Sequence, residues 1–380
     1  MKRLVIAVLA IGAMAACTKS NVQYEQSGEI SLQPVTQKAT KSAVDGTYYP
    51  TETAYNFNVW AWWGEGDPGT GLDEFITPSP TDYISEGTFT ARNNVSWGGV
   101  TPYYWPTKGS LVFAGYSPAS AKVEGQDAPV FHYDLPTKTF SVSNYTQSNN
   151  IAATKDLMWF DATNVSYDQN GAENKGVPVQ FKHALSWLTF KFNLLSAATA
   201  EMWTITDVKL TGIEDNATFT AVKDDTPEWS TAAKSAEGMD VVNVYNAGEG
   251  TGYTVAYVNG GTVLPNTDVV FEGTNVLNNA VLVIPQSCAT GDAKLVITYK
   301  MKTYVDGVDP IDQEVTLPLN GSQITDNKWL PGKHYIYTIT FGANEILIAP
   351  TVQDWDDVHV GEDNNDATDD DNDDNPEITD

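Results

Sequence analysis

The chain has 380 residues, of which 41% are hydrophobic and 11% aromatic, and it is long enough for two domains with full cores. Its 49 acidic residues outnumber 21 basic ones, and the formal net charge of −28 at pH 7 argues against nucleic acid or an anionic bilayer as a partner. With only two cysteines, Cys17 and Cys288, the chain cannot build a disulfide framework or a cysteine metal site.

The first residues have the layout of an export signal. Lys2 and Arg3 precede the apolar run 4–11, which is too short to span a bilayer as a stable helix. Small residues follow up to Cys17, and the segment resembles a bacterial lipobox, in which the cysteine thiol receives a diacylglycerol. We therefore expect residues 1–16 to be a signal peptide and the mature chain to be a lipoprotein. An ordinary signal peptide with a cysteine near its end is the alternative.

Two polar regions flank the rest of the chain. Residues 17–46 are rich in Ser, Thr, Gln and Lys and indicate a lipidated tether. Residues 361–380 hold ten acidic residues and no basic ones, which is typical of a disordered, solvated tail. The acidic run 369–374 could attract calcium weakly, but it lacks the glycine and terminal glutamate of a calcium loop.

The block between these regions is expected to be β throughout. Apolar and polar residues alternate in short runs, turn-forming residues separate the runs, and almost nothing shows a sustained helical period. Such a pattern favours antiparallel sandwiches over a parallel sheet. The alanine-rich segment 194–200 is the expected boundary, which places one sandwich at 47–196 and another at 197–360. The expected strands are 56–61, 111–113, 179–192, 204–210, 269–271, 281–284, 294–302, 314–319, 334–341 and 345–348.

A search for catalytic or metal-binding patterns finds little. The four histidines include no pair at metal-ligand spacing, and His183 alternates with core positions on an expected strand, which favours a structural role. The run 115–119 resembles a nucleophile elbow but lacks its final glycine. No glycine-rich loop precedes a helix. We expect no enzyme activity, no cofactor and no metal site.

The tryptophans are concentrated near the start of the β block. Five of the eleven fall between Trp60 and Trp105. Trp62 and Trp63 are consecutive, so on a strand their side chains face opposite sides of the sheet. One of them is then exposed, as a sugar-stacking or protein-contact surface, unless a loop covers it as part of the core.

Several short motifs follow one another along the β block. The longest is VPVQFKHALSWLTF, at 177–190. The others are YWP at 104–106 with LVFAGYSP at 111–118, DLM at 156–158, IPQ at 284–286, and WLPGKHYIYTI at 329–339. In sequence and order they resemble the motifs of the fimbrillin-like proteins of Bacteroidetes, of both the major and the minor type. The resemblance spans most of residues 50–355.

The resemblance implies two tandem transthyretin-like sandwiches and a pilus subunit that serves adhesion at the outer membrane. Such subunits are exported as lipoproteins and cut after a basic residue, which removes the first strand and leaves a groove. A strand from another subunit then fills the groove by β-augmentation. In this chain Ile30 and Leu32 would belong to the removable plug strand, because 29–35 alternates apolar and polar residues. Lys38 and Lys41 are the candidate processing positions.

Two features depart from the family's pattern. The only arginines are Arg3 and Arg92, so an arginine-specific cut in the linker is impossible, and processing at a lysine or no processing remains open. A shaft subunit would also need a C-terminal donor strand with alternating apolar residues, but after Trp355 the chain offers only Val358 and Val360 before the acidic run. Burying the unpaired carboxylates of that run in an apolar groove would be costly. This shifts the expectation from a shaft subunit toward an accessory, anchor or tip subunit.

A second class of function stays open at this stage. A surface glycan-binding lipoprotein would also be built of β-sandwiches and would use exposed aromatic side chains such as Trp62 and Trp63. The expected partners are therefore other pilus subunits, the outer membrane through the lipid on Cys17, and a host or glycan ligand.

The lipobox leads to a direct prediction. Replacing Cys17 with Ser removes the thiol that would carry the lipid, and anchoring is lost because each buried methylene contributes about 0.8 kcal/mol. We expect the Cys17→Ser protein to leave the outer membrane fraction and to lose acyl labelling. Unchanged membrane partitioning of this variant would contradict the prediction.

Overall fold

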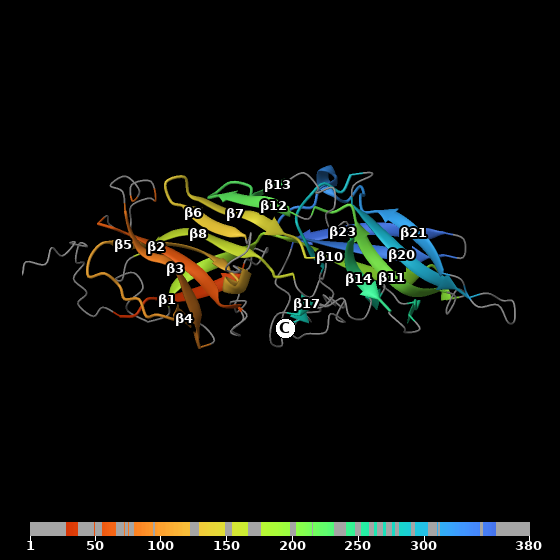
Figure 1. Cartoon of the computed structure of the whole chain (residues 1–380), viewed down its shortest axis with the longest axis horizontal. Helices are drawn as coiled ribbons and strands as arrows, with labels where there is room; N and C mark the ends of the chain where they lie inside the picture. The colour runs from red at the N-terminus through yellow and green to blue at the C-terminus, as the bar shows by residue number, and fades with distance from the viewer. Residues whose placement is uncertain are drawn as a thin grey trace, which may run out of the picture.

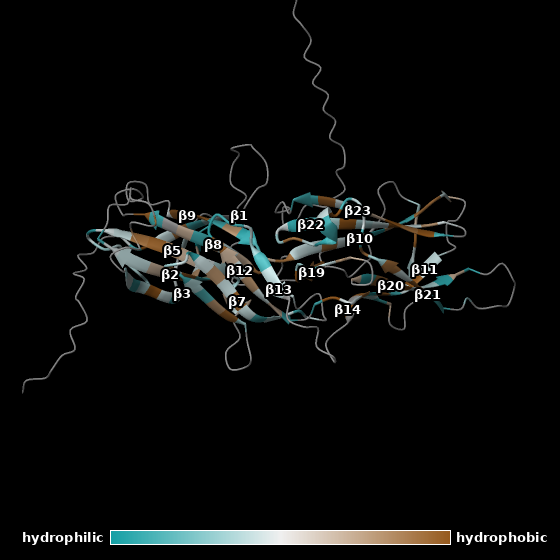
Figure 2. Ribbon diagram, turned by 90° about the horizontal axis from the view of Figure 1, so that it is seen from above, coloured by the Kyte–Doolittle hydropathy of each residue, from teal (hydrophilic) through white to brown (hydrophobic). Residues whose placement is uncertain are grey.

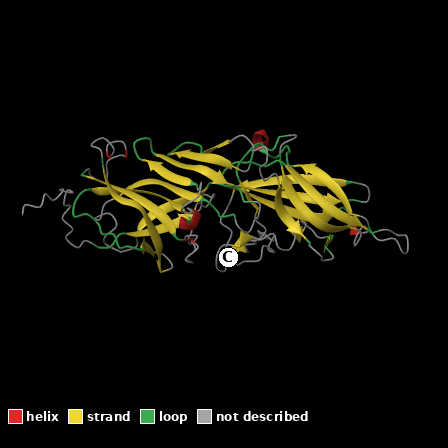
Figure 3. Cartoon of the chain, in the orientation of Figure 1, coloured by secondary structure: helices red, strands yellow, loops and turns green. Residues whose placement is uncertain are grey.

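Strands make up almost all of the regular structure (Figure 3). Short 3₁₀ turns accompany them, among them Ala119–Ala121 and Thr325–Asn327. The expectation of an all-β chain is therefore confirmed, and no helix within the described residues is long and apolar enough to cross a membrane.

The computed structural model describes residues 28–36, 49, 55–65, 72, 75, 80–93, 96–121, 129–148, 154–165, 176–197, 203–214, 216–231, 241–247, 252–257, 262–263, 269–270, 276–277, 281–289, 293–302, 310, 312–342 and 345–354.

The strands form two lobes side by side (Figure 1). In the N-terminal lobe, seven strands form a sheet that closes on itself in the order β1-β4-β3-β2-β5-β8-β9. All of its pairs are antiparallel except β1 with β9. The strands are β1 (Ser31–Thr36), β2 (Phe57–Gly64), β3 (Thr81–Asn93), β4 (Ser96–Gly99), β5 (Ser110–Ser117), β8 (Met158–Val165) and β9 (Val177–His183).

A four-stranded sheet packs against the outside of this closed sheet and completes the N-terminal core. Aromatic side chains meet at the contact: the ring of Phe140 lies 6.3 Å from that of Tyr116 and 6.4 Å from that of Trp159, and the Trp159 ring lies 4.9 Å from that of Phe219. The sheet order is β13-β12-β7-β6. Its strands are β6 (Val130–Asp134), β7 (Thr139–Thr146), β12 (Asn216–Val222) and β13 (Glu228–Thr231).

The C-terminal lobe contains two facing sheets with their own core. One has the order β16-β10-β22-β23 with β19 beside β10, and the other has the order β14-β11-β20-β21 with β15 beside β11. A further short pair joins β17 (Val269–Val270) to β18 (Val276–Leu277). The strands of the two sheets are β10 (Ser186–Leu194), β11 (Trp203–Thr211), β14 (Val241–Asn246), β15 (Tyr253–Thr254), β16 (Thr262–Val263), β19 (Val281–Val283), β20 (Lys294–Met301), β21 (Asp312–Pro318), β22 (Lys333–Phe341) and β23 (Ile346–Asp354).

Hydropathy along the strands explains why two layers form in each lobe. Figure 2 shows hydrophobic and hydrophilic bands following one another along many strands. In β20, for example, every second side chain from Leu295 to Tyr299 is buried and the residues between them are partly exposed. Because successive side chains of a strand point to opposite faces, each such strand covers a core with one face and meets water with the other.

Strand pairing crosses the boundary expected at 196/197. β10, expected in the first sandwich, pairs in parallel with β22 of the C-terminal lobe, whereas β12, expected in the second, pairs with β7 of the N-terminal lobe. Figure 1 shows β12 and β13 beside β6 and β7. The buried clusters follow this pairing, because Phe219 and Trp229 belong to the N-terminal core and Phe190 to the C-terminal core.

The long strand expected at 179–192 is two strands in different sheets. β9 ends at His183 and β10 begins at Ser186, and the chain between them passes from one lobe to the other. The Leu185 carbonyl accepts a hydrogen bond from the Gly332 N–H, at 3.0 Å, and the Ala184 carbonyl accepts one from Trp229 Nε1, at 2.7 Å. The turn between the two sheets is thus held from both lobes.

Gln147 links the lobes through its side-chain amide. The side chain is buried, its Nε2 donates to the Leu282 carbonyl at 3.0 Å, and its Oε1 accepts from the Ile284 N–H at 3.0 Å. The amide of Gln147 therefore pairs with the backbone of the C-terminal lobe as a neighbouring strand would.

Replacing Gln147 with Leu tests this link. The variant leaves a buried carbonyl and a buried N–H unpaired, so we expect the free energy of unfolding to fall by about 2–4 kcal/mol. The matched control is Gln180→Leu, at an exposed position of β9, which should change the free energy by about 0.5 kcal/mol or less. Denaturant unfolding of both variants measures the difference, and equal effects would refute the bridging role.

Candidate functional site

Strand β1 joins the two ends of the closed sheet. It pairs in parallel with β9 from Leu32↔Val177 to Thr36↔Phe181, and antiparallel with β4 at Ser31↔Gly98 and Leu32↔Trp97. Before the strand, the Ile30 N–H donates to the Tyr103 carbonyl at 2.7 Å. Without β1, β4 and β9 would each present an unpaired edge to solvent.

The buried face of β1 contributes to the N-terminal core. Ile30 and Leu32 have no exposed surface, while Ser31 and Gln33, which alternate with them, are partly exposed. This is the alternation that the sequence predicts for the plug strand. Burying the two aliphatic side chains stabilises the seated strand by about 1.5–3 kcal/mol each.

A group of aromatic side chains fills the space enclosed by the closed sheet. The Tyr49 ring lies 5.0 Å from the Phe181 ring, 5.8 Å from the Phe57 ring and 5.8 Å from the Trp97 ring. All four rings are almost fully buried. Because β4 carries Trp97 and β9 carries Phe181, the two strands that flank β1 both contribute to this aromatic core.

Polar contacts fix the register of β1 at its edges. Glu29 forms an ion pair with Arg92 at 3.1 Å, and Arg92 also donates to the Gly99 carbonyl at 2.7 Å. The Ser31 and Ser96 hydroxyl oxygens lie 2.6 Å apart. The charged side chains of the ion pair are about 40% exposed, so the pair contributes at most about 1 kcal/mol and acts mainly in alignment.

Gly176 allows β9 to approach β1 closely. Its φ is +88°, in the region that favours glycine, and a Cβ at this position would lie 3.0 Å from the Leu32 carbonyl carbon and from the Ser31 oxygen. A larger residue here would push β1 away. The position is one that the sequence pattern of 29–35 does not reveal.

The remaining residues singled out from the sequence lie elsewhere. Trp62 and Trp63, on β2, are half-buried and pack against the N-terminal core. The Trp62 ring is 5.5 Å from that of Tyr133, and Trp63 Nε1 donates to the Lys108 carbonyl at 2.9 Å. Outside the described residues lie three further positions from the sequence analysis, Cys17, Lys38 and Lys41.

Two histidines that could suggest chemistry are packed inside the protein. His183 Nδ1 lies 2.9 Å from a carboxylate oxygen of Asp156, and both side chains are buried. The pair joins two motifs, DLM at 156–158 and the one that contains His183, and sequence spacing gives no sign of it. Within the described residues, no three His, Cys, Asp or Glu side chains are grouped to hold a metal ion.

His334 is held as a neutral ring. Burial, and to a smaller extent the nearby Lys191 charge, lowers the pKa of His334 to about 3. The ring stacks on Trp187 with 3.8 Å between centroids and contacts the Thr189 hydroxyl at 2.8 Å. We interpret His334 as a structural residue that joins β22 to β10.

A sequence profile described as fimbrillin-like matches residues 40–355. The chain belongs to the fimbrillin-like family. The resemblance seen in the motifs is therefore confirmed, and the match begins after β1.

Solved structures of fimbrial and adhesion proteins resemble the chain. A fimbrial protein from Bacteroides vulgatus is 16% identical, has a TM-score of 0.58 and is matched over 86% of this chain and 100% of its own, which shows a shared fold. A candidate cell adhesion protein from Bacteroides uniformis is 15% identical with a TM-score of 0.46, over 86% and 99%. A fimbrial assembly protein from Parabacteroides distasonis is 12% identical with a TM-score of 0.34, over 86% and 99%. The curated proteins include no match.

A charge placed on the buried face of β1 tests how the strand is seated. Leu32→Asp puts a carboxylate where no water reaches it, so we expect β1 to leave the sheet and the amides of 29–36 to exchange rapidly with deuterium. Gln33→Asp is the control on the other face of the same strand and should keep the amides protected. Protected amides in the Leu32→Asp variant would show that β1 is held by something other than its buried face.

Proposed function

We propose that the chain is a fimbrial subunit at the bacterial surface, anchored in the outer membrane by lipid on Cys17 and assembled by donor-strand β-augmentation. In this reading the two lobes correspond to the tandem transthyretin-like domains of the family. The proposal rests on one observation above all. β1 alone connects β4 to β9, so its removal opens a groove with two strand edges and an apolar, aromatic floor.

The energetics of such a groove favour another strand. Each backbone hydrogen bond of the seated strand contributes about 1 kcal/mol net, and the buried aliphatic side chains add to this. After β1 leaves, the exposed N–H and C=O groups and the aromatic floor lose these partners. An extended segment with apolar residues at alternate positions restores both sets of contacts, which is the physical basis of β-augmentation.

Cleavage in the linker after β1 makes the exchange feasible. While the chain is intact, β1 is held at a high effective concentration beside its own groove, and a second strand cannot compete with it. After a cut at Lys38 or Lys41, β1 is bound only by its noncovalent contacts. The family match supports this division, because it begins at residue 40 and so leaves β1 outside the matched region.

The C-terminal end supports an accessory, anchor or tip position. β23 pairs along its full length, Ile346–Asp354, with β22 and is thereby engaged in its own lobe. The segment that follows carries Val358 and Val360 and then the acidic run, which fits an apolar groove poorly. The chain would thus accept a donor strand more readily than supply one. We propose adhesion as the role of the assembly and no enzyme activity.

Peptide exchange tests the proposal directly. The full-length protein is cut with a lysine-specific protease, and a fluorescent peptide with the sequence of residues 28–36 is added. We expect the cut protein to take up the peptide as its own β1 dissociates. The uncut Lys38→Gln/Lys41→Gln variant is the control and should exclude the peptide.

The same experiment can refute the proposal. If the cut protein never takes up the peptide, or if cut and uncut proteins bind it equally, β1 is a permanent strand and residues 37–48 are a simple linker.

A further inference from the structure

The groove that β1 fills extends beyond β1 itself. Before the strand begins, Glu29 forms an antiparallel bridge with Tyr104, and the Trp105 N–H donates to the Gly28 carbonyl at 3.2 Å. The segment that would leave the groove therefore starts at residue 28, and backbone contacts hold the residue before Ile30 at a fixed position along the groove.

The apolar face of the seated strand does not fix its register. Ile30, Leu32 and Pro34 are all buried, at every second position. Because side chains repeat on one face every two residues, a strand with this pattern that slips by two residues still directs apolar side chains to the aromatic core. A contact at one particular position along the groove is needed to favour a single register.

Arg92 supplies a contact of this kind from a β-bulge in β3. Between its pairs at Ala91 and Asn93, β3 has one residue more than β4, and Arg92 is the extra residue. Bulges are places where a side chain is turned in a new direction. Here the side chain crosses β4 and reaches the carboxylate of Glu29, at 3.1 Å.

Glycines on β4 give Arg92 its path across the strand. A Cβ at Gly98 would lie 2.7 Å from Arg92 Nε and 3.0 Å from Glu29 Oε1, so a side chain there would displace the ion pair. The Gly99 carbonyl accepts a hydrogen bond from Arg92 at 2.7 Å. Since this bond does not involve β1, it can hold the guanidinium at the rim of the groove after β1 has left.

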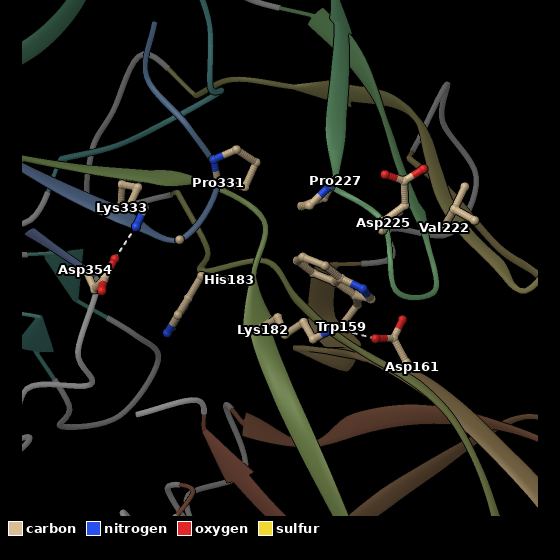
Figure 4. Close-up of a pocket in the computed structure, with 12 residues that line it drawn as sticks. Trp159, Asp161, Lys182, His183, Val222, Asp225, Pro227, Pro331, Lys333 and Asp354 are labelled. Carbon is tan, nitrogen blue, oxygen red and sulfur yellow. Dashed lines mark hydrogen bonds and ion pairs between the residues drawn. The ribbon is translucent and has the colours of Figure 1, made fainter. Parts of the chain in front are cut away.

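The lysine nearest to the other end of the groove is differently placed. Lys182 follows the paired part of β9, but it pairs with Asp161. Both line a pocket of about 440 Å³, in which Lys333 pairs with Asp354 (Figure 4). These carboxylates lie outside the segment that would leave, so both pairs remain when the groove opens. Arg92, by contrast, loses its carboxylate.

We propose that Arg92 selects the donor strand through a carboxylate on the residue before the donor's first buried side chain. This inference rests on the proposed function. The preferred donor is a six-residue segment with Asp or Glu at its first position and apolar residues at its second, fourth and sixth. It runs parallel to β9, as β1 does. A slip by two residues moves the carboxylate away from Arg92, so the ion pair favours one register.

Competition between peptides tests this selection. The full-length protein is cut with a lysine-specific protease and loaded with the fluorescent peptide of residues 28–36, which unlabelled peptides then displace. The competitors are the native peptide, its Glu29→Gln variant, and a Glu29→Gln/Gln33→Glu variant that keeps the net charge but moves the carboxylate. We expect both variants to bind about fivefold more weakly than the native peptide, which corresponds to an exposed ion pair of about 1 kcal/mol.

A protein variant and its control assign the preference to Arg92. Arg92→Gln removes the charge at the groove, and Lys108→Gln removes the lysine of an exposed ion pair with Glu65 elsewhere. We expect the Arg92→Gln protein to bind the native and Glu29→Gln peptides equally, and the Lys108→Gln protein to keep the fivefold difference. Added salt should reduce that difference because the ion pair is exposed. Thermal unfolding before cleavage shows that both variants are folded.

The possible outcomes separate this inference from the proposed function. Equal binding of the three peptides by the unaltered protein would overturn selection by Arg92 and leave strand exchange intact. A preference for the native peptide that persists in the Arg92→Gln protein would do the same. If the cut protein takes up none of the peptides, strand exchange itself is refuted, and selection by Arg92 is refuted with it.

Discussion

The backbone hydrogen bonds of one six-residue strand decide whether the N-terminal sheet has free edges. β1 lies between β4 and β9, and the residues that hold it there come from distant parts of the chain: Trp97 and Phe181 in the core, Arg92 at the rim. A closed sheet has no edge to offer another protein, whereas the same sheet without β1 has two. The proposed assembly, the buried alternation of Ile30 and Leu32, and the close approach at Gly176 all depend on this strand.

The two lobes are joined by backbone and side-chain contacts rather than by a linker. The motif that contains His183 spans the passage from β9 to β10. Trp229 and Gly332 donate hydrogen bonds to the backbone carbonyls of this passage, and Gln147 binds the backbone of β19, which pairs with β10. The motif at 177–190 thus spans the place where the lobes meet.

The alternation of apolar and polar residues along the sequence predicted many of the strands. It could not predict how strands that are distant in the sequence pair with one another. Alternation predicted the strands at 56–61 and 294–302 and the extended segment with Ile30 and Leu32, and in the structure the alternate apolar residues of each are buried. The same pattern predicted one strand at 179–192 where the structure has β9 and β10. Both strands are largely buried, and the periodicity of a sequence does not show where the chain leaves one sheet for another. The expected boundary at 196/197 also placed residues 216–222 in the second sandwich, whereas β12 pairs with β7, some 70 residues earlier. Arg92 and Gln147 act through such long-range contacts, and no local signal marks them.

The most direct test of the account is to determine which strand occupies the space between β4 and β9 in an assembled fimbria. Cryo-electron microscopy of fimbriae that contain this subunit would show the side chains of that strand. The account predicts a strand from another subunit, with apolar side chains in the positions of Ile30 and Leu32, and no density for residues 29–36 of the same chain. Density for the chain's own β1 in the assembled state would contradict it.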